Sequence, residues 1–317
     1  MNPLVSVVMP GYNAAPYVEQ AVRSALQQTC RGAELLFVDD GSTDGTGDKV
    51  QVLQAEFGDR LTLLRTQRGG PYPARNLALA RARGEWVAFL DADDWWAPDF
   101  LQNMLDALGQ GGDDVAYCGW QNVGDGVSSG RAEPYVPPDY LAGDPVEQFL
   151  GNCPWPIHAA LVRRSVVAQL GGFSERMFSS MDYDFWIRLL AVTRKMVRVP
   201  RALAYYRWHG GGQISATKWR QVLNAWQVRR DFVATHPALV AHLPAARRRE
   251  LVDGVLLQAG YEAFWRRDLD SAQPLFRKAL RTGAWQRKDL KYVVASLLPG
   301  RAYRALVGRA DVQGARP

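Results

Sequence analysis

The chain has 317 residues, of which 47% are hydrophobic and 22% are charged. This composition excludes general disorder and suffices for one large domain or two of ordinary size. The formal net charge of +6 is unevenly distributed, because residues 247–309 hold 14 basic and 6 acidic side chains and the rest of the chain holds 24 and 26. The positive surplus could meet an anionic membrane, an anionic substrate or nucleic acid, or it could be the solvated face of helices.

Cysteine spacing and hydropathy exclude further classes of protein. Cys30, Cys118 and Cys153 are widely separated and lack zinc-ligand spacing, so neither a disulfide framework nor a structural metal is expected. The N-terminus lacks a basic segment followed by an apolar core, and the chain has no apolar run of about 18 residues. These patterns predict a cytoplasmic protein that is at most peripheral to a membrane.

The first hundred residues predict strands that alternate with helices. Short β-branched or apolar strands are expected at 4–9, 34–38, 61–64 and 86–90, with helices at 18–26, through Val50 and Leu53, and at 75–83. This alternation indicates an α/β fold with a mainly parallel, doubly wound sheet, in which ligands bind at the carboxyl ends of strands. Polar residues follow Met9, Val38 and Leu90, so we expect them to converge on one crevice.

The rest of the chain becomes increasingly helical. We expect a helix to about residue 108, a strand at 115–120, a Gly-, Pro- and Asp-rich excursion at 124–145, and helices at 162–170 and 183–192. From residue 216 the pattern is helical throughout, with a helical hairpin over 255–282 that has no second copy. The sequence therefore predicts a first domain at 1–215 and a helical C-terminal extension at 216–317.

Asp91-Ala92-Asp93 places two carboxylates at alternate positions after a buried strand. Such a pair can share a divalent cation and the hydroxyls of a bound ribose, and oxygen ligands suit Mg²⁺ or Mn²⁺. The cation would then bridge the phosphates of a nucleotide. Because the same pattern occurs by chance in many loops, its position after the strand at 86–90 is what gives it weight.

Five segments occur in the order of the signatures of family 2 glycosyltransferases, which the chain resembles. These segments are Ser6 to Asn13, Val38 to Thr46, Ala74-Arg75-Asn76, Gly84-Glu85-Trp86 and Leu90 to Asp94. The resemblance is close over residues 4–120 and sparser to about 215. It implies a GT-A fold, which is Rossmann-like, and an inverting, metal-dependent transferase that uses a nucleotide-sugar donor.

The resemblance also implies which residues hold the nucleobase. Pro10, Tyr12 and Asp40 would bind it, with Asn13 and Asp39 beside them. In the family, an aspartate at the position of Asp40 accepts from the imide N–H of uracil. This favours a UDP-sugar or a dTDP-sugar as the donor.

The resemblance implies further roles around the phosphates. Asp91 would face the ribose and, with Asp93, ligate Mn²⁺ or Mg²⁺, and Ala92 would lie between them in the substrate-binding loop. Arg75 would order this loop or approach the phosphates, unless it is a surface residue. His209 would contact the diphosphate or complete the metal shell, unless it is a hydrogen-bonded structural histidine.

Residues 181–188 resemble the Glu-Asp-Tyr-Asp-Leu-Trp-Leu-Arg segment of the family. The resemblance makes Asp182 the general base, since inverting transfer needs a carboxylate that removes the proton of the attacking hydroxyl. Met181 replaces the usual acidic residue, and Asp184 remains the alternative base.

The acceptor is the least defined part of the hypothesis. Aromatic side chains could stack on acceptor sugars or could pack in the core, namely Trp120, Trp155, His158 and Trp186. We expect a glycan or a lipid-linked glycan, as in polysaccharide biosynthesis for the cell envelope.

Residues 281–309 interleave basic with aromatic and aliphatic side chains. This composition is typical of a helix on an anionic membrane, here the inner face of the plasma membrane, and equally of a face that packs on the catalytic domain or on a second subunit of a homodimer. Nucleic acid is not expected as a partner. The alternative to an enzyme is a nucleotide-sugar-binding protein without turnover that recruits partners through its C-terminal helices.

Overall fold

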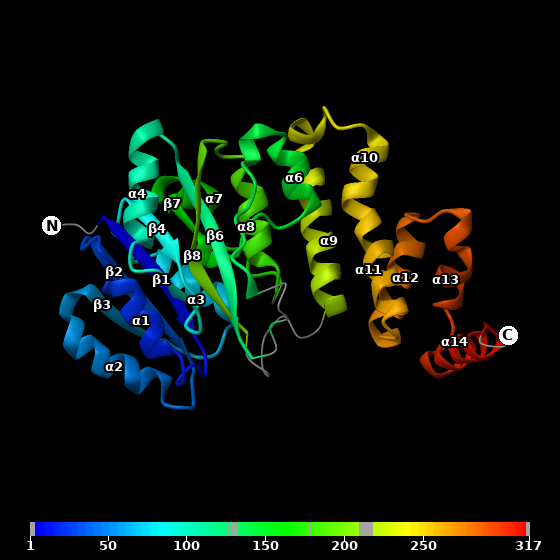
Figure 1. The fold of residues 1–317 in the computed structure, drawn as a ribbon, viewed down its shortest axis with the longest axis horizontal. Coiled ribbons are helices and arrows are strands. Elements are labelled where there is room, and N and C mark those ends of the chain that lie inside the picture. The colour runs from blue at the N-terminus through cyan, green and yellow to red at the C-terminus, as the bar shows by residue number, and fades with distance from the viewer. Residues whose placement is uncertain (1–3, 126, 128–131, 178, 209–217, 315–317) are drawn as a thin grey trace. The chain divides into compact units, whose positions relative to one another are not determined.

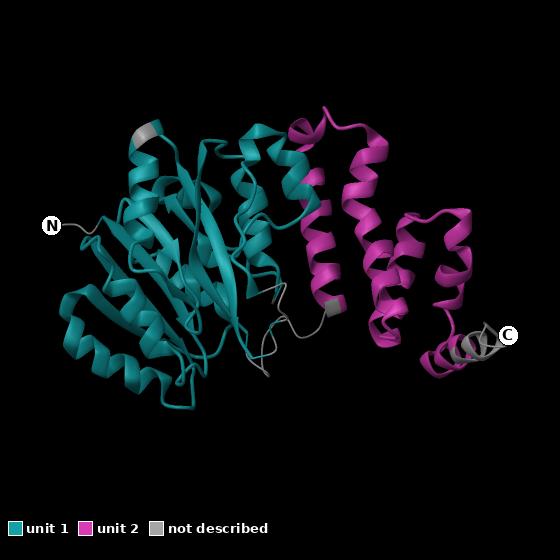
Figure 2. Cartoon of the chain, in the orientation of Figure 1, with its two compact units in different colours: residues 1–213 teal, residues 214–317 magenta. Residues whose placement is uncertain are grey.

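The computed structural model divides into two compact units, residues 1–213 and 214–317, which are described separately below (Figure 2). The structure describes residues 4–125, 127, 132–177, 179–208 and 218–314.

The first unit is built on one mixed sheet of eight strands (Figure 1). In chain order the strands are β1 (Val5–Gly11), β2 (Ala33–Asp40), β3 (Leu61–Thr66), β4 (Trp86–Phe89), β5 (Trp95–Trp96), β6 (Val115–Gly124), β7 (Ala160–Arg163) and β8 (Met196–Trp208). Their order in the sheet is β3-β2-β1-β4-β7-β6-β8-β5. The strands β3, β2, β1 and β4 are mutually parallel, as are β6 and β8, whereas β7 is antiparallel to both of its neighbours.

Seven α-helices accompany this sheet within the described part of the first unit. They are α1 (Val18–Leu26), α2 (Thr46–Phe57), α3 (Pro71–Leu79), α4 (Phe100–Gly111), α6 (Pro145–Gly151), α7 (Arg164–Leu170) and α8 (Met181–Leu189). Every residue of β1 and β2 is buried, as expected for parallel strands covered on both faces. The polar loops that follow β1, β2 and β4 therefore begin at a rigid edge of the core.

Three strands differ from the sequence prediction: β7, β8 and the two-residue β5, which was not predicted. The helix expected over 162–170 begins only at Arg164, because Ala160–Arg163 pairs with β4 and β6 as strand β7. The strand β8 was not predicted. It contains Pro200, which cannot donate to a ladder, and its register against β6 shifts between Cys118 and Gly119. The irregularity accommodates the proline. It also interrupts the alternation of apolar and polar residues by which a strand is predicted from sequence.

The second unit is helical. Its elements are α9 (Lys218–Thr235), η5 (Pro237–Val240), α10 (Ala245–Arg249), the π-helical turn η6 (Glu250–Gly254), α11 (Val255–Trp265), α12 (Leu269–Thr282), η7 (Arg287–Asp289), α13 (Leu290–Ala295) and α14 (Gly300–Gly314). The predicted hairpin is confirmed as α11 and α12, where a Cβ on Gly260 would approach the ring of Phe276 to 2.9 Å. Among the described helices, none has the length and apolar character needed to cross a bilayer.

Candidate active site

The loop after β1 is fastened to the loop after β2. The backbone N–H of Asn13 donates to Ser42 Oγ at 3.0 Å, and Asn13 Oδ1 accepts from the N–H of Thr43 at 2.9 Å. Asn13 has a φ of 50°, a left-handed conformation that asparagine tolerates better than most residues. The N–H of Ala15 also donates to Asp44 Oδ2 at 2.9 Å. The first two predicted loops are therefore one interlocked structure.

Asp39 and Asp40 are buried at the end of β2 and accept hydrogen bonds from backbone groups. Asp39 Oδ1 accepts from the N–H of Ser42 at 3.0 Å. The two carboxylate oxygens of Asp40 accept from the N–H groups of Gly69 at 2.7 Å and Gly70 at 2.8 Å. Each oxygen keeps a second lone pair, so the carboxylate can hold the start of α3 and still accept another donor.

Tyr12 presents a partly exposed ring at the same edge, with 38% of the residue accessible. The guanidinium carbon of Arg68 lies 3.9 Å from the centre of this ring, and Arg68 Nη1 donates to Tyr12 Oη at 2.7 Å. Pro10 is buried in β1 opposite Val38. The edge therefore offers an aromatic surface above a buried carboxylate, which is a chemistry suited to a nucleobase.

Arg75 joins α3 to the loop after β4. It is only 4% exposed, and its Nη2 donates to Asp91 Oδ1 in a charge-assisted contact. The side chain of Asp91 is 30% exposed. Arg75 Nε is buried without a hydrogen-bond partner among the described residues. Arg75 is therefore no surface residue, and its charge is paired with Asp91.

The Asp91–Asp94 loop is held from β8. The backbone N–H of Arg207 donates to Asp94 Oδ1 at 2.7 Å, and Arg207 Nε donates to the carbonyl oxygen of Asp93 at 2.8 Å. Asp94 Oδ2 lies 3.1 Å from Nδ1 of the fully buried His158. Burial raises the pKa of Asp94, and the neighbouring His158 opposes this rise. Ala92 and Asp94 are buried, whereas Asp91 and Asp93 are partly exposed, so only part of this loop faces solvent.

Asp182 lies at the start of α8, beside Arg75 and Asp91. Burial raises the pKa of Asp182, the Arg75 charge lowers it and the Asp91 charge raises it. The N–H of Met181 donates to the hydroxyl of Tyr72 on α3 at 3.2 Å, which ties α8 to the helix that carries Arg75. The structure thus brings the predicted base to the predicted donor site.

Tyr206 of β8 lies where the carboxylates gather. Burial raises its pKa, and further increases come from the charges of Asp94, Asp91, Asp93 and Asp182. Its ring stacks on His158 with 5.6 Å between centroids. A protonated hydroxyl in this position can donate to a carboxylate or to a ligand.

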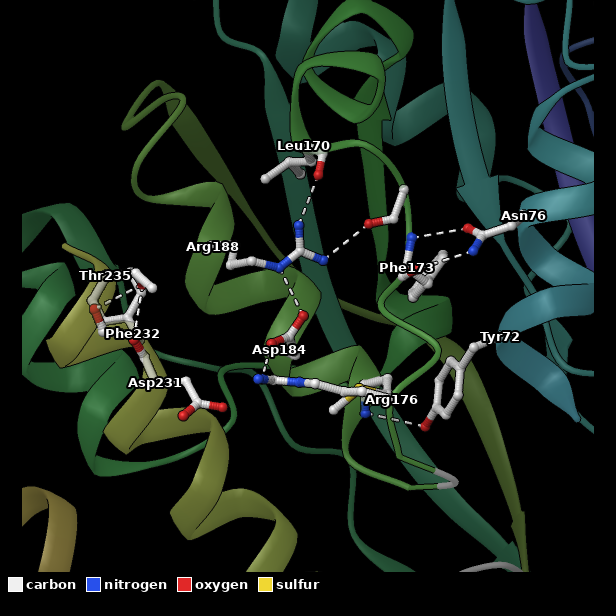
Figure 3. A network of polar contacts seen from close by, with 12 residues as sticks. Tyr72, Asn76, Leu170, Phe173, Arg176, Asp184, Arg188, Asp231, Phe232 and Thr235 are labelled. Atoms are coloured by element: carbon white, nitrogen blue, oxygen red, sulfur yellow. Dashed lines mark hydrogen bonds and ion pairs between the residues drawn. The ribbon is translucent and has the colours of Figure 1, made fainter.

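Asp184 is held by two arginines (Figure 3). Its Oδ1 accepts from Arg176 Nη2 at 2.8 Å and its Oδ2 accepts from Arg188 Nε at 2.7 Å. Arg188 continues to the carbonyl oxygens of Leu170 at 2.8 Å and Gly172 at 2.9 Å. With both oxygens in ion pairs and the residue buried, Asp184 fastens α8 to the end of α7.

Asn76, next to Arg75 in the Ala-Arg-Asn segment, fastens α3 to the loop after α7. Its amide donates to the carbonyl oxygen of Phe173 at 2.8 Å and to Glu175 Oε1 at 2.7 Å, and it accepts from the N–H of Phe173 at 2.9 Å (Figure 3). A Cβ on Gly172 would lie 2.6 Å from Asn76 Oδ1, so the close approach requires glycine. The Ala-Arg-Asn segment was the available signal for this role.

Of the four aromatic side chains that could stack on acceptor sugars or pack in the core, three pack in the core. Trp155, His158 and Trp186 are at most 1% exposed, and Trp155 stacks on Tyr117 with 4.4 Å between ring centroids. Trp155 also contacts Trp186 of α8, with 5.4 Å between ring centroids, so these rings are part of the core. Trp120 is half-buried.

The donor set can be compared with the needs of a metal ion. Within the described ranges, no group of three or more His, Cys, Asp or Glu side chains is placed to hold one, and His209 lies outside the described residues. Mg²⁺ is commonly held by one or two carboxylates together with substrate phosphates. Asp91 and Asp93 are partly exposed carboxylates on one loop, so they fit a cation shared with a nucleotide.

Residues 6–171 match the sequence model of Glycosyl transferase family 2. The chain belongs to glycosyltransferase family 2. This transferase is 30% identical over 236 residues to TuaG of Bacillus subtilis, named for teichuronic acid biosynthesis, a match that covers 74% of this chain and 90% of TuaG. It is 29% identical over 243 residues to WfgD of Escherichia coli, a UDP-Glc:α-D-GlcNAc-diphosphoundecaprenol β-1,3-glucosyltransferase, covering 76% of this chain and 90% of WfgD.

Solved structures of transferases share the fold of this family 2 member. Residues 1–349 of Staphylococcus aureus TarS, in complex with UDP-GlcNAc, align with a TM-score of 0.63 at 21% identity, over 98% of this chain and 92% of that one. The mannosyltransferase PcManGT of Pyrobaculum calidifontis, with GDP-Man and Mn²⁺, aligns with a TM-score of 0.56 at 22% identity, over 94% and 86%. The predicted GT-A fold is confirmed.

Proposed function

We propose that this transferase moves a sugar from a UDP-sugar or dTDP-sugar to a glycan or lipid-linked glycan, with inversion at the anomeric carbon. The observation that carries the proposal is the ion pair between Arg75 and Asp91, whose two charges both act on Asp182. WfgD supports the substrate classes, because its name gives a UDP-sugar donor and a lipid-linked acceptor.

The donor would lie along the loops that follow β1, β2 and β4. Tyr12 supplies the aromatic surface for the base, with Pro10 beneath and the remaining lone pairs of Asp40 available to an imide N–H. Asp91 would face the ribose and, with Asp93, hold Mn²⁺ or Mg²⁺. When bound, this cation neutralises charge on the departing diphosphate.

Asp182 would remove the proton from the attacking acceptor hydroxyl. Its buried environment raises the pKa of the carboxyl, which makes the carboxylate a better base than an exposed aspartate. Asp184 is unsuited to this role because both of its oxygens are held by arginines.

Arg75 would act as the electrostatic link between donor and base. A positive charge beside Asp91 and Asp182 offsets the repulsion between the two carboxylates and favours the ionised form of Asp182.

The proposal is tested by Asp182→Asn with two measurements on the same protein. We expect transfer to fall by about 10²–10⁴-fold, the usual contribution of a general base, while UDP binding measured by calorimetry is retained. Asp106→Asn, at an exposed position on α4, is the matched control and should leave both quantities unchanged. Retained transfer in Asp182→Asn would reject this base.

The donor range and the alternative function are tested together by screening nucleotide sugars for hydrolysis and transfer with and without Mn²⁺. Preference for a purine nucleotide would reject the role of Asp40, and activity without metal would reject that of Asp93. If wild-type protein binds a nucleotide sugar but turns over none of the donors, a binding protein that recruits partners through its C-terminal helices becomes the better account.

A further inference from the structure

The solvent-facing side of α13 is apolar. Leu290, Val294, Leu297 and Leu298 are 45%, 48%, 59% and 38% exposed. The spacing of four and then three residues places the first three on one side of a helix, and helical hydrogen bonding continues past α13 through the N–H groups of Leu297 and Leu298. We call these four residues the α13 face.

The opposite side of this helix is fully packed. Val293 and Ser296 are completely buried, and the carbonyl oxygen of Ser296 accepts from Gln273 Nε2 at 3.0 Å and from Arg277 Nε at 2.5 Å. The ring of Tyr292 stacks on Phe276 with 5.8 Å between centroids. The helix is therefore anchored with a defined orientation, and the exposure of the α13 face is a property of the folded unit.

Charge around the α13 face is predominantly positive. The exposed charged side chains of residues 286–306, a segment that the structure describes throughout, are Arg287, Lys288, Lys291, Arg301 and Arg304. The single acid of that segment, Asp289, is 2% exposed and accepts from Tyr261 Oη at 2.6 Å and the N–H of Gln286 at 2.8 Å. Arg304 is paired with the exposed Asp270 of α12. The other four basic side chains keep the surroundings of the α13 face predominantly positive.

We infer that the α13 face binds the surface of an anionic lipid bilayer. An apolar helical side enters the boundary between headgroups and acyl chains, and flanking lysines and arginines are attracted to anionic headgroups. A second copy of the chain fits less well, because an isologous contact would set these basic side chains against their own equivalents. The inference narrows the basic region 281–309 to a surface centred on residues 290–298.

The inference deepens the proposed function, and its link to a lipid-linked acceptor rests on that function. A transferase held on the bilayer meets such an acceptor in two dimensions instead of three. Vesicle binding itself requires neither donor nor acceptor. The protein could therefore fail to bind vesicles and still transfer sugar to a water-soluble acceptor, or bind vesicles and show no transfer.

The experiment measures cosedimentation of the full chain with vesicles of phosphatidylcholine, with and without phosphatidylglycerol. Wild-type protein should bind the anionic vesicles and release them as salt is raised. The double variant Val294→Ser/Leu297→Ser should bind about tenfold more weakly, because it removes apolar area that enters the bilayer. Lys288→Gln/Lys291→Gln should lose a similar factor on the anionic vesicles.

Val52→Ser is the matched control, since Val52 on α2 is 72% exposed and has no role in the inference. It should bind as wild type does. UDP affinity and the midpoint of thermal unfolding verify that every variant is folded. Because all five substituted positions, Val52 included, are exposed, we expect both quantities to be unchanged.

Three results would overturn the inference. They are the absence of vesicle binding by wild-type protein, equal binding with and without phosphatidylglycerol, and unchanged binding by both double variants. Light scattering identifies the competing occupant: a dimer that Val294→Ser/Leu297→Ser dissociates, in a protein that ignores vesicles, would assign the α13 face to a second copy.

Discussion

At the scale of single residues, the role of each aspartate in the site depends on which arginines interact with it. Asp182 and Asp184 are separated by one residue, yet Asp184 has both oxygens in ion pairs while Asp182 interacts with Arg75 at a distance. The sequence predicted both as candidates and could not separate them. The distinction arises from Arg176 and Arg188, whose positions depend on the loop between α7 and α8.

Replacing Arg75 with Gln should alter the pH dependence of transfer. Arg75 lowers the pKa of Asp182, so its loss should raise that pKa further and leave less of the base ionised at a given pH. We expect the acidic limb of the kcat/KM profile to move to higher pH, and the rate at pH 7 to fall by roughly tenfold or more.

The control for this measurement is Arg65→Gln, because Arg65 makes an exposed ion pair with Asp48 on the same unit. Its profile should coincide with that of wild type. An Arg75→Gln profile with a lower plateau and an unmoved acidic limb would show that Arg75 acts on the donor alone.

Asp44 makes stability depend on pH. Burial acts to raise the pKa of Asp44, but hydrogen bonds from the hydroxyl and N–H of Thr46 and from the N–H of Ala15 outweigh it and hold the pKa below its usual value. A lowered pKa stabilises the fold above the unfolded-state pKa, and the stabilisation is lost as pH falls through the folded-state pKa. Asp44→Asn should therefore cost about 1 kcal/mol near neutral pH.

Denaturant unfolding of wild type and Asp44→Asn measures this difference. It should be largest around pH 7 and shrink below about pH 4, where the wild-type carboxylate takes up its proton. A difference that is constant across this range would mean that the ionised form makes no special contribution.

At the scale of elements, helix α3 organises the site. Tyr72 contacts the start of α8, Arg75 contacts Asp91, and Asn76 holds the backbone of Phe173. These positions are separated by three residues and then by one, so a single turn of helix connects the donor loop, the base and the loop after α7. The sequence motif marked this helix, but its contacts to backbone atoms depend on the fold.

Asn76→Ala should loosen the loop after α7. It leaves the buried carbonyl and N–H of Phe173 without their side-chain partner, for which we expect a loss of about 2 kcal/mol in the free energy of unfolding. Urea unfolding gives this value, and Gln102→Ala, which removes an exposed helical contact to Asp106, should change it by less than about 0.5 kcal/mol. Equal effects of the two substitutions would contradict the role of Asn76.

At the scale of the whole molecule, features that depend on neighbouring residues in the sequence could be predicted, whereas contacts between residues far apart in the chain could not. The buried strands β1, β2 and β4 and the loops after them were predicted, because apolar runs and turn residues carry that signal locally. The pairing of Asp94 with His158 and the clamp made by Arg207 were not, since they join residues far apart in the chain. For the same reason, the sequence left open whether Trp155 lines an acceptor surface or packs in the core, where the structure places it.

Asp40 performs two tasks with one carboxylate. It anchors Gly69 and Gly70, where α3 begins, and it is the group proposed to recognise the nucleobase. Binding free energies are reciprocal, so a base that draws Asp40 toward itself must also bias the position of α3, and with it Arg75. A mismatched base would then be penalised twice, once in affinity and once in the ionisation of Asp182, although it never touches that residue.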